Sequence, residues 1–172
     1  MQVLAALLVL VILALVAFRL YTHLAVHERR VVAAWDRLDT LLTQRNGLLE
    51  RACSATRADP PLDLRALQQL VQEQERARRC GDLPGLARGE RAIRAEWDHI
   101  RTQILDKYNN LSVSPDRLPP RVAALDQAIT EALGRYNAAV DAYAGLRCQW
   151  AYGLLARLAG HAVFHPVRPP SP

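Results

Sequence analysis

The chain of 172 residues is poor in the residues that build most catalytic and metal sites. It contains three cysteines, five histidines and a single lysine, Lys107. Cys53, Cys80 and Cys148 have no metal-ligand spacing, and an odd set of cysteines predicts free thiols in a reducing compartment. A glycine-rich phosphate loop, a nucleophile elbow and a zinc pattern are also missing. We therefore predict no enzyme activity, no catalytic residue, no cofactor and no metal site.

The sequence also lacks the basic blocks that are typical of nucleic-acid binding. The net charge is +5 and the isoelectric point is about 9.6. Arginines alternate with acidic residues along most of the chain, as in residues 73–79, a pattern typical of a solvated helix face. A basic balance also suits a domain held beside an anionic inner leaflet. We predict no nucleic-acid partner.

Polar side chains are almost absent from the first 20 residues. Residues 3–18 form an unbroken apolar run that ends at Arg19. A cleaved signal peptide would need a basic residue before this run and a small-x-small cleavage site after it, and the sequence has neither. The run predicts a retained transmembrane helix over residues 1–21, with Arg19 reaching the headgroups and Tyr21 in the aromatic interface.

The charges next to this segment predict its orientation. Arg19, Arg29, Arg30 and Arg37 all follow the apolar run, whereas only the α-amine precedes it. The positive-inside rule then places the N-terminus outside and the body in the cytoplasm. We expect a single-pass protein of the cell membrane, with membrane lipid as one partner.

The body shows apolar residues at alternating spacings of three and four, and no window alternates with period two. Glycine and proline breaks divide it into helices to about residue 57, then at about 62–80, 84–111 and 119–159. The fold class predicted is all-α, with a single transmembrane helix continuing into a long antiparallel (up-down-up-down) helical bundle with coiled-coil-like seams. This bundle covers residues 22–165, and a proline-rich disordered tail covers 166–172. The core prediction includes Val31, Trp35, Leu38, Leu42, Leu49, Leu67, Val71, Ile93, Trp97, Val122, Ile129, Tyr136, Tyr143, Trp150 and Leu154.

Two arginines interrupt these apolar stripes. Arg45 lies within the first stripe and Arg157 lies near the end of the fourth. A charge on a buried face needs a partner, and the sequence does not assign one. Alternatively, Arg45 lies beyond the packed seam and covers apolar surface with its stem.

The antiparallel order returns the fourth helix to the membrane. Its end combines aromatic, aliphatic and basic residues, which suits an interfacial helix. The alternative is a last core turn that packs on the first helix near Leu24 and Val31. The candidate membrane-interface residues are Arg19, Tyr21, Trp150, Tyr152, Arg157 and Phe164.

Two histidine pairs have a spacing that would allow metal binding. His23 and His27 are four residues apart, as are His161 and His165, which places each pair on one helix face. No third and fourth ligands are evident, so we interpret the pairs as membrane-proximal polar residues. His99 in a phosphotransfer bundle is a further alternative, but its neighbours lack the small residues and lysine of such sites.

Three stretches follow a known family pattern in order and spacing. They are YTHLAVHERRVVAAWDRLDTLLTQRNGLLE (21–50), YNNLSVSP (108–115) and RYNAAVDAYAGLRCQWAYGLLARLAGHAVFHPV (135–167). With the N-terminal span, they resemble the LemA family of bacterial membrane proteins. The matching residues are Tyr21, Arg29, Arg30, Val32, Ala34, Trp35, Leu38, Asp39, Leu42, Arg45, Leu48, Leu49, Arg135, Tyr136, Asn137, Val140, Tyr143, Leu155, Ala156, Gly160 and Phe164.

The chain departs from that family in ways that make it a divergent member. Residues 47–52 lack the family's Pro and Asn, the middle pattern is hard to find between Cys53 and Leu83, and a proline near Trp150 is missing. The resemblance implies a single-span protein of the bacterial inner membrane with a cytoplasmic helical body. It implies no established catalytic residue.

Three functional hypotheses follow. The leading one is a membrane-anchored helical scaffold that meets a protein partner or further copies of itself. The second is a membrane-remodelling or lipid-binding protein that uses its C-terminal basic aromatic segment. The third, and least favoured, is an enzyme subunit or metal-binding protein.

Overall fold

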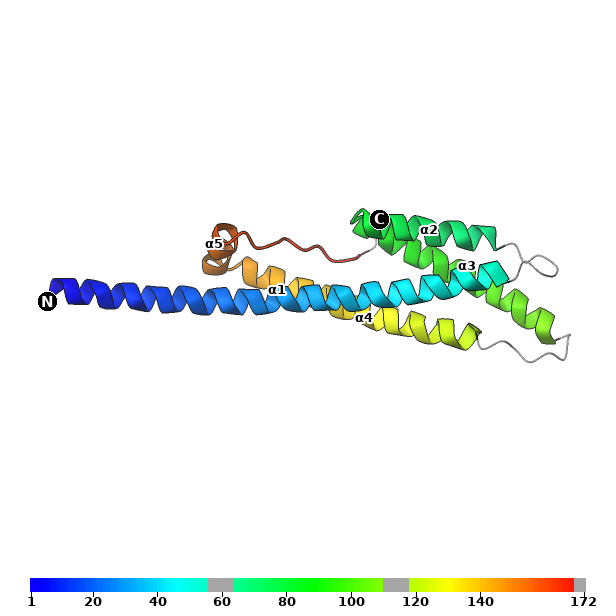
Figure 1. Cartoon of the computed structure of the whole chain (residues 1–172), viewed down its shortest axis with the longest axis horizontal. Helices are drawn as coiled ribbons and strands as arrows, with labels where there is room; N and C mark the ends of the chain where they lie inside the picture. Colours follow the sequence, from blue (N-terminus) through cyan, green and yellow to red (C-terminus); the bar gives the residue numbers. More distant parts are fainter. Residues whose placement is uncertain (56–63, 110–117, 169–172) are drawn as a thin grey trace. The chain divides into compact units, whose positions relative to one another are not determined.

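A computed structural model describes residues 1–55, 64–109 and 118–168. Its helices are α1 (Gln2–Ala55), α2 (Arg65–Arg79), α3 (Leu83–Asn109), α4 (Leu118–Arg147) and α5 (Trp150–Leu158) (Figure 1). The described residues contain no strand. The prediction of an all-α helical bundle is confirmed.

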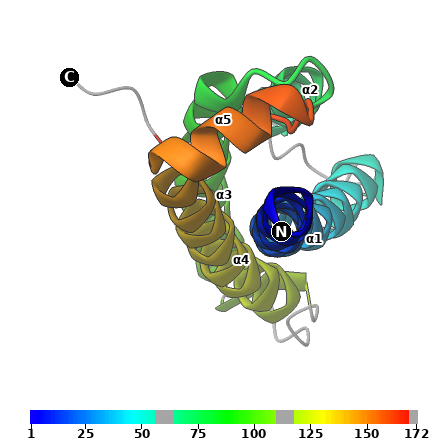
Figure 2. The same cartoon turned by 90° about the vertical axis from the view of Figure 1, so that its left-hand side faces the viewer.

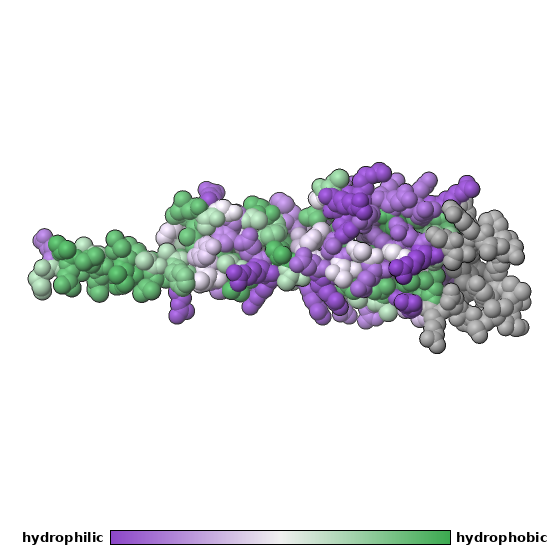
Figure 3. Space-filling model, viewed as in Figure 1, coloured by the Kyte–Doolittle hydropathy of each residue, from purple (hydrophilic) through white to green (hydrophobic). Residues whose placement is uncertain are grey.

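Helix α1 is unbroken over 54 residues. Its sequence has no proline and one glycine, Gly47, so no residue in it forces a kink. The apolar side chains of residues 3–18 are all exposed, and Figure 3 shows the N-terminal end of the molecule as a hydrophobic surface. A helix that is apolar all round is stable in lipid or in a core rather than in water. By length and composition α1 can therefore cross a membrane.

Two compact units make up the described chain. The first, which we call the anchor unit, comprises Met1–Arg37 and Gly134–Pro166. The second, the bundle unit, comprises Leu38–Leu133 and Val167–Pro172, of which residues 169–172 lie outside the described residues.

The bundle unit packs the end of α1 with α2, α3 and the start of α4, and consecutive helices run antiparallel (Figure 1). Its core takes side chains from all four helices because each presents one apolar stripe to the others. Each of these core side chains is at most 4% exposed. They are Leu49, Leu67, Val71, Ile93, Trp97, Ile100 and Val122.

The turn between α2 and α3 is encoded locally. Gly81 has a positive φ of 69°, which ends α2 because L side chains disfavour this conformation. The Asp82 amide closes the turn on the Ala77 carbonyl oxygen at 2.9 Å. The Asp82 carboxylate then accepts from the Gly85 amide at 2.9 Å, which caps the start of α3.

The anchor unit pairs the first part of α1 with the second part of α4 in antiparallel order. The rings of Trp35 and Tyr136 are 5.3 Å apart. Nearer the apolar segment, Glu28 pairs with His161. Trp35 is only half-buried, whereas Trp97 in the bundle unit is 4% exposed, so the core prediction holds better for the second tryptophan.

The prediction of one continuous helix over 119–159 is wrong. Helix α4 ends at Arg147, and Gln149 adopts an extended backbone with ψ 132° before α5 begins. The chain turns a sharp corner here (Figure 1; Figure 2), and Gly153 lets the α5 backbone approach the end of α4. A Cβ on Gly153 would lie 2.7 Å from the carbonyl oxygen of Arg147.

The remaining helix limits agree with the sequence to within a few residues, as α2 and α3 show. The predicted ends at residues 57 and 111 lie outside the described residues. The structure differs from the predicted disordered tail at its first residues, because Val167 is 3% exposed and packs in the bundle unit.

Candidate functional site

A buried polar cluster occupies the middle of the bundle unit. Arg45 on α1 is fully buried, and its Nη1 donates to Glu90 on α3 at 2.7 Å and to Asp126 on α4 at 3.1 Å. Its Nη2 donates to the side-chain oxygens of Asn46 and Gln74, both at 3.3 Å. The guanidinium thus joins α1, α2, α3 and α4.

This cluster, which we call the Arg45 network, settles the question raised by the first apolar stripe. The alternative in which Arg45 lies beyond the packed seam is wrong, because none of its side chain is exposed. The sequence flagged the residue but not its partners. Glu90 and Asp126 are 45 and 81 residues further along the chain, so only the tertiary fold brings them together.

The network favours the charged form of Glu90. Burial alone would raise the pKa of Glu90, but the guanidinium groups of Arg45 and Arg94 outweigh it and lower the pKa below its ordinary value. Gln74 also donates to Glu90 at 2.8 Å. Arg94 donates to Glu90 at 2.9 Å and to Thr130 at 2.8 Å.

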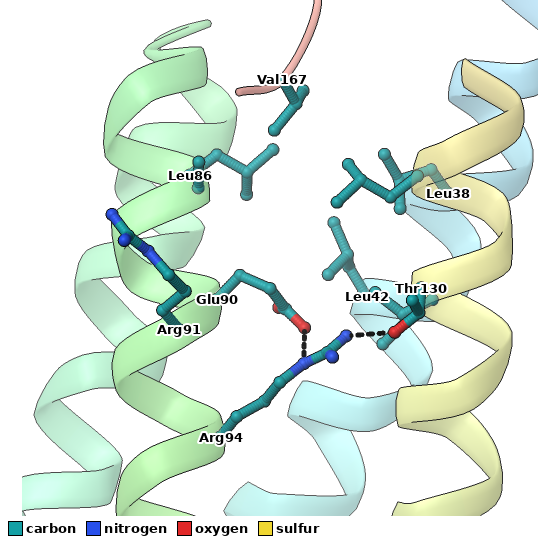
Figure 4. A pocket seen from close by; sticks show the side chains of 11 residues that line it. Leu38, Leu42, Leu86, Glu90, Arg91, Arg94, Thr130 and Val167 are labelled. Carbon is teal, nitrogen blue, oxygen red and sulfur yellow. Dashed lines mark hydrogen bonds and ion pairs between the residues drawn. The ribbon is translucent and has the colours of Figure 1, made fainter. Parts of the chain in front are cut away.

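A pocket of about 170 Å³ adjoins this network between α1, α3 and α4 (Figure 4). Leu38, Leu42 and Leu86 line it, and Val167 from the C-terminal segment covers part of it. Its polar lining is Glu90, Arg91, Arg94 and Thr130, and Arg94 donates to both Glu90 and Thr130. The pocket is therefore largely apolar and shows no arrangement of a nucleophile with a base.

The second notable surface lies on α5 in the anchor unit. Trp150, Leu154 and Leu158 are spaced by four residues, so they share one face of the helix. They are 84%, 56% and 78% exposed, whereas Ala156 on the other side is buried. We call these three residues the α5 face. The core prediction for Trp150 and Leu154 is wrong, because the break at Gln149 turns their side chains out of the packed stripe.

Helix α5 is positioned by contacts with α1 just beyond the apolar segment. The hydroxyl of Tyr152 lies 3.1 Å from Nδ1 of His23. A surface hollow there is lined by Arg19, Thr22, His23 and Tyr152. Figure 2 looks along α1 and shows α5 from the side, so α5 crosses the direction of α1.

The segment after α5 is tied to α4 by hydroxyl groups and one guanidinium. Tyr136 donates to the carbonyl oxygen of His165 at 2.9 Å, and Tyr143 donates to that of Ala162 at 3.1 Å. Burial raises the pKa values of both tyrosines, so both hydroxyls remain donors at neutral pH. Arg147 also donates to the Ala162 carbonyl oxygen.

The six predicted interface residues fall into two groups. Arg19, Tyr21, Trp150 and Arg157 are exposed, and Tyr152 is half-buried beside His23. The exposure of Arg157 contradicts its predicted place on a buried stripe. Phe164 packs inward, with its ring 5.6 Å from that of Tyr143, so it is separate from the exposed group.

The two histidine pairs do not converge on a common centre. The rings of His23 and His27 are 4.9 Å apart, and burial, His23 and Arg30 lower the pKa of His27. His161 is instead paired with Glu28. In the part of the chain that the structure describes, no three His, Cys, Asp or Glu residues are grouped to hold a metal ion.

The α5 face was missed as a separate feature because the break before α5 was missed. The spacing of Trp150, Leu154 and Leu158 was visible in the sequence, and Gly153 was the local signal for close backbone approach. Periodicity alone placed Trp150 and Leu154 in the apolar stripe of the fourth predicted helix.

Comparison of the chain with protein-family models, with curated proteins and with solved structures finds no match. Membership of the LemA family stays a prediction from the sequence.

Proposed function

We propose that this chain is a non-enzymatic, membrane-anchored helical scaffold that resembles the LemA proteins. The observation that carries the proposal is the continuity of α1. Its first part is apolar on every side, and its later residues Leu38, Leu42 and Leu49 are packed in the bundle unit. One unbroken helix thus contributes its first part to the anchor and its last part to the bundle unit.

The placement in a bacterial inner membrane rests on charge and on the family resemblance. Arg19, Arg29 and Arg30 follow the apolar segment directly, and such a charge bias favours a cytoplasmic body with the N-terminus outside. The free thiols of Cys80 and Cys148 are compatible with a reducing compartment.

The polar groups of the bundle support a scaffold rather than an enzyme. Glu90 and Asp126 are bound by arginines inside the Arg45 network. Their carboxylates are therefore used to hold helices together. The exposed helix faces remain for a cytoplasmic protein or for another copy of the chain.

The anchor is tested with Val9→Arg combined with Ile12→Arg in the full chain. Each arginine at the centre of a span costs roughly 2.5–3.5 kcal/mol. We expect the double variant to leave the membrane on alkaline carbonate extraction, whereas the parent chain and the control Val32→Arg remain. Retention of the double variant, or an N-terminus shortened by cleavage, would contradict a retained anchor.

The scaffold role is tested by crosslinking the full chain in native membranes, followed by mass spectrometry. We expect a reproducible set of crosslinks to one protein or to a second copy. A monodisperse monomer with no crosslinked protein would count against the scaffold.

A further inference from the structure

We propose that α5 is an interfacial helix whose exposed apolar face lies in the surface of an anionic phospholipid bilayer. The inference rests on the proposed membrane anchor and names a second contact with the same membrane. In this proposal the α5 face, which consists of Trp150, Leu154 and Leu158, contacts lipid and not another protein.

Helix α5 exposes its apolar face. A helix on a water-soluble domain normally buries its apolar face and exposes its polar one. Here the apolar face is the exposed one, with Trp150 at 84% and Leu158 at 78%. The opposite side, including Ala156 and Tyr152, faces the anchor unit. Such a face needs an apolar environment to be stable.

Helix α5 lies beside the part of α1 that directly follows the apolar segment. The contact of Tyr152 with His23 and the hollow they share with Arg19 put α5 beside the residues that end the apolar run. When residues 3–18 cross a bilayer, Arg19 lies at its surface, and α5 lies at the same level. The bilayer can therefore cover the α5 face without a second protein.

The direction of α5 also suits a helix at the membrane surface. Because α5 crosses the direction of α1 (Figure 2), a span along the membrane normal leaves α5 along the membrane plane. This is the geometry in which an amphipathic helix inserts its apolar face between headgroups and acyl chains. Tryptophan favours this boundary, since its indole combines an apolar ring with a hydrogen-bond donor.

Charge selects the lipid class. Arg157 is exposed at the edge of the α5 face, and exposed Arg19 lies next to Tyr152. Both can reach phosphate groups while their stems cover apolar surface. Arg147 does not take part, because its guanidinium binds the carbonyl oxygens of His161 and Ala162. We expect stronger contact with phosphatidylglycerol than with phosphatidylcholine.

The test uses the full chain reconstituted in phosphatidylglycerol-containing vesicles with lipids brominated near the headgroup end of the acyl chains. Bromine quenches tryptophan fluorescence only on contact. We expect quenching that disappears in Trp150→Phe and persists in Trp35→Phe. Leu154→Ser combined with Leu158→Ser should abolish the quenching of Trp150, whereas the exposed control Val32→Ser should leave it unchanged.

The outcomes separate the α5 inference from the anchor. A chain that floats with vesicles but shows no Trp150 quenching would overturn the inference and leave the anchor intact. A chain that does not float would overturn both. A third outcome has two parts: Trp150 is shielded from aqueous acrylamide equally in detergent and in vesicles, and crosslinks form between the α5 helices of two copies. This outcome would show that a second copy, and not lipid, covers the α5 face.

Discussion

The guanidinium of Arg45 is buried among four helices and has lost its hydrating water. Four side-chain acceptors replace that water, on Glu90, Asp126, Asn46 and Gln74. Taking the charge out of water is costly, so the ion pair is weak evidence of net stabilisation. Removing one partner of the pair is strongly destabilising, because the other charge is left buried without a partner. The network therefore makes the helix arrangement specific by penalising every packing in which Arg45 and Glu90 do not meet.

We predict that Arg45→Ala lowers the free energy of unfolding by about 3–5 kcal/mol, because Glu90 is left buried without its main partner. Chemical denaturation of the full chain in detergent, followed by far-ultraviolet circular dichroism, measures the change. Arg79→Ala is the matched control, since Arg79 pairs with Glu75 but is 75% exposed. It should cost no more than about 1 kcal/mol. Equal losses in the two variants would contradict the role of the network.

We also predict a pH dependence that belongs to Glu90. Its pKa is lowered in the folded state, so it contributes stability above the unfolded pKa of about 4.5, and this contribution is lost as the pH falls through the folded pKa. Denaturation at a series of pH values should show the loss in the parent chain. Glu90→Gln should be less stable at neutral pH and flatter in acid, whereas Glu73→Gln, at an exposed position, should follow the parent curve. A Glu90→Gln curve parallel to that of the parent would refute the assignment.

At the scale of elements, the corner between α4 and α5 depends on one missing methyl group. Gly153 donates its amide to the Gln149 carbonyl oxygen at 2.8 Å and leaves room for the carbonyl of Arg147. The corner sets the direction of α5, and that direction exposes Trp150.

We predict that Gly153→Ala destabilises the corner by about 1–3 kcal/mol, since its Cβ would overlap backbone that cannot move freely. The matched control is Gly134→Ala in α4, where a Cβ meets nothing within 4 Å. Alanine there should stabilise the helix by roughly 0.5–1 kcal/mol. Hydrogen exchange of the amides in residues 148–160 measures the local effect. Slower exchange in Gly153→Ala than in the parent would show that the helix tolerates the side chain.

The limits of sequence reasoning are visible at this same corner. The end of α2 and the start of α3 could be predicted because Gly81 and Asp82 encode the turn locally. The break at Gln149 could not be predicted in this way, because the spacing of apolar residues continues across it and does not report a change in helix direction. The pairing of Arg45 with Glu90 was equally out of reach, since it depends on helix packing. The apolar segment was the easiest to predict, because its signal needs no partner.

At the scale of the whole molecule, the native cysteines report the predicted topology. Cys80 and Cys148 are exposed, whereas burial raises the pKa of the half-buried Cys53. We predict that a membrane-impermeant maleimide labels none of them in intact cells. In inverted inner-membrane vesicles it should label Cys80 and Cys148 quickly and Cys53 slowly, because the thiolate is the reactive form. The extent of labelling is read by mass spectrometry.

Substitution of Cys80 and Cys148 identifies which cysteines give the fast phase of maleimide labelling. In vesicles, Cys80→Ser with Cys148→Ser should leave only the slow phase. Fast labelling of Cys148 in intact cells would place the body outside and reverse the orientation inferred from Arg19, Arg29 and Arg30.

The burial of Arg45 has a consequence for the order in which the chain is made. The ribosome releases Arg45 before Glu90 and Asp126, which follow 45 and 81 residues later. During that interval neither carboxylate partner of Arg45 has been made, so the arginine stays in water. The network that joins four helices can therefore close only after the start of α4 has been made, which places the completion of the bundle late in the synthesis of the chain.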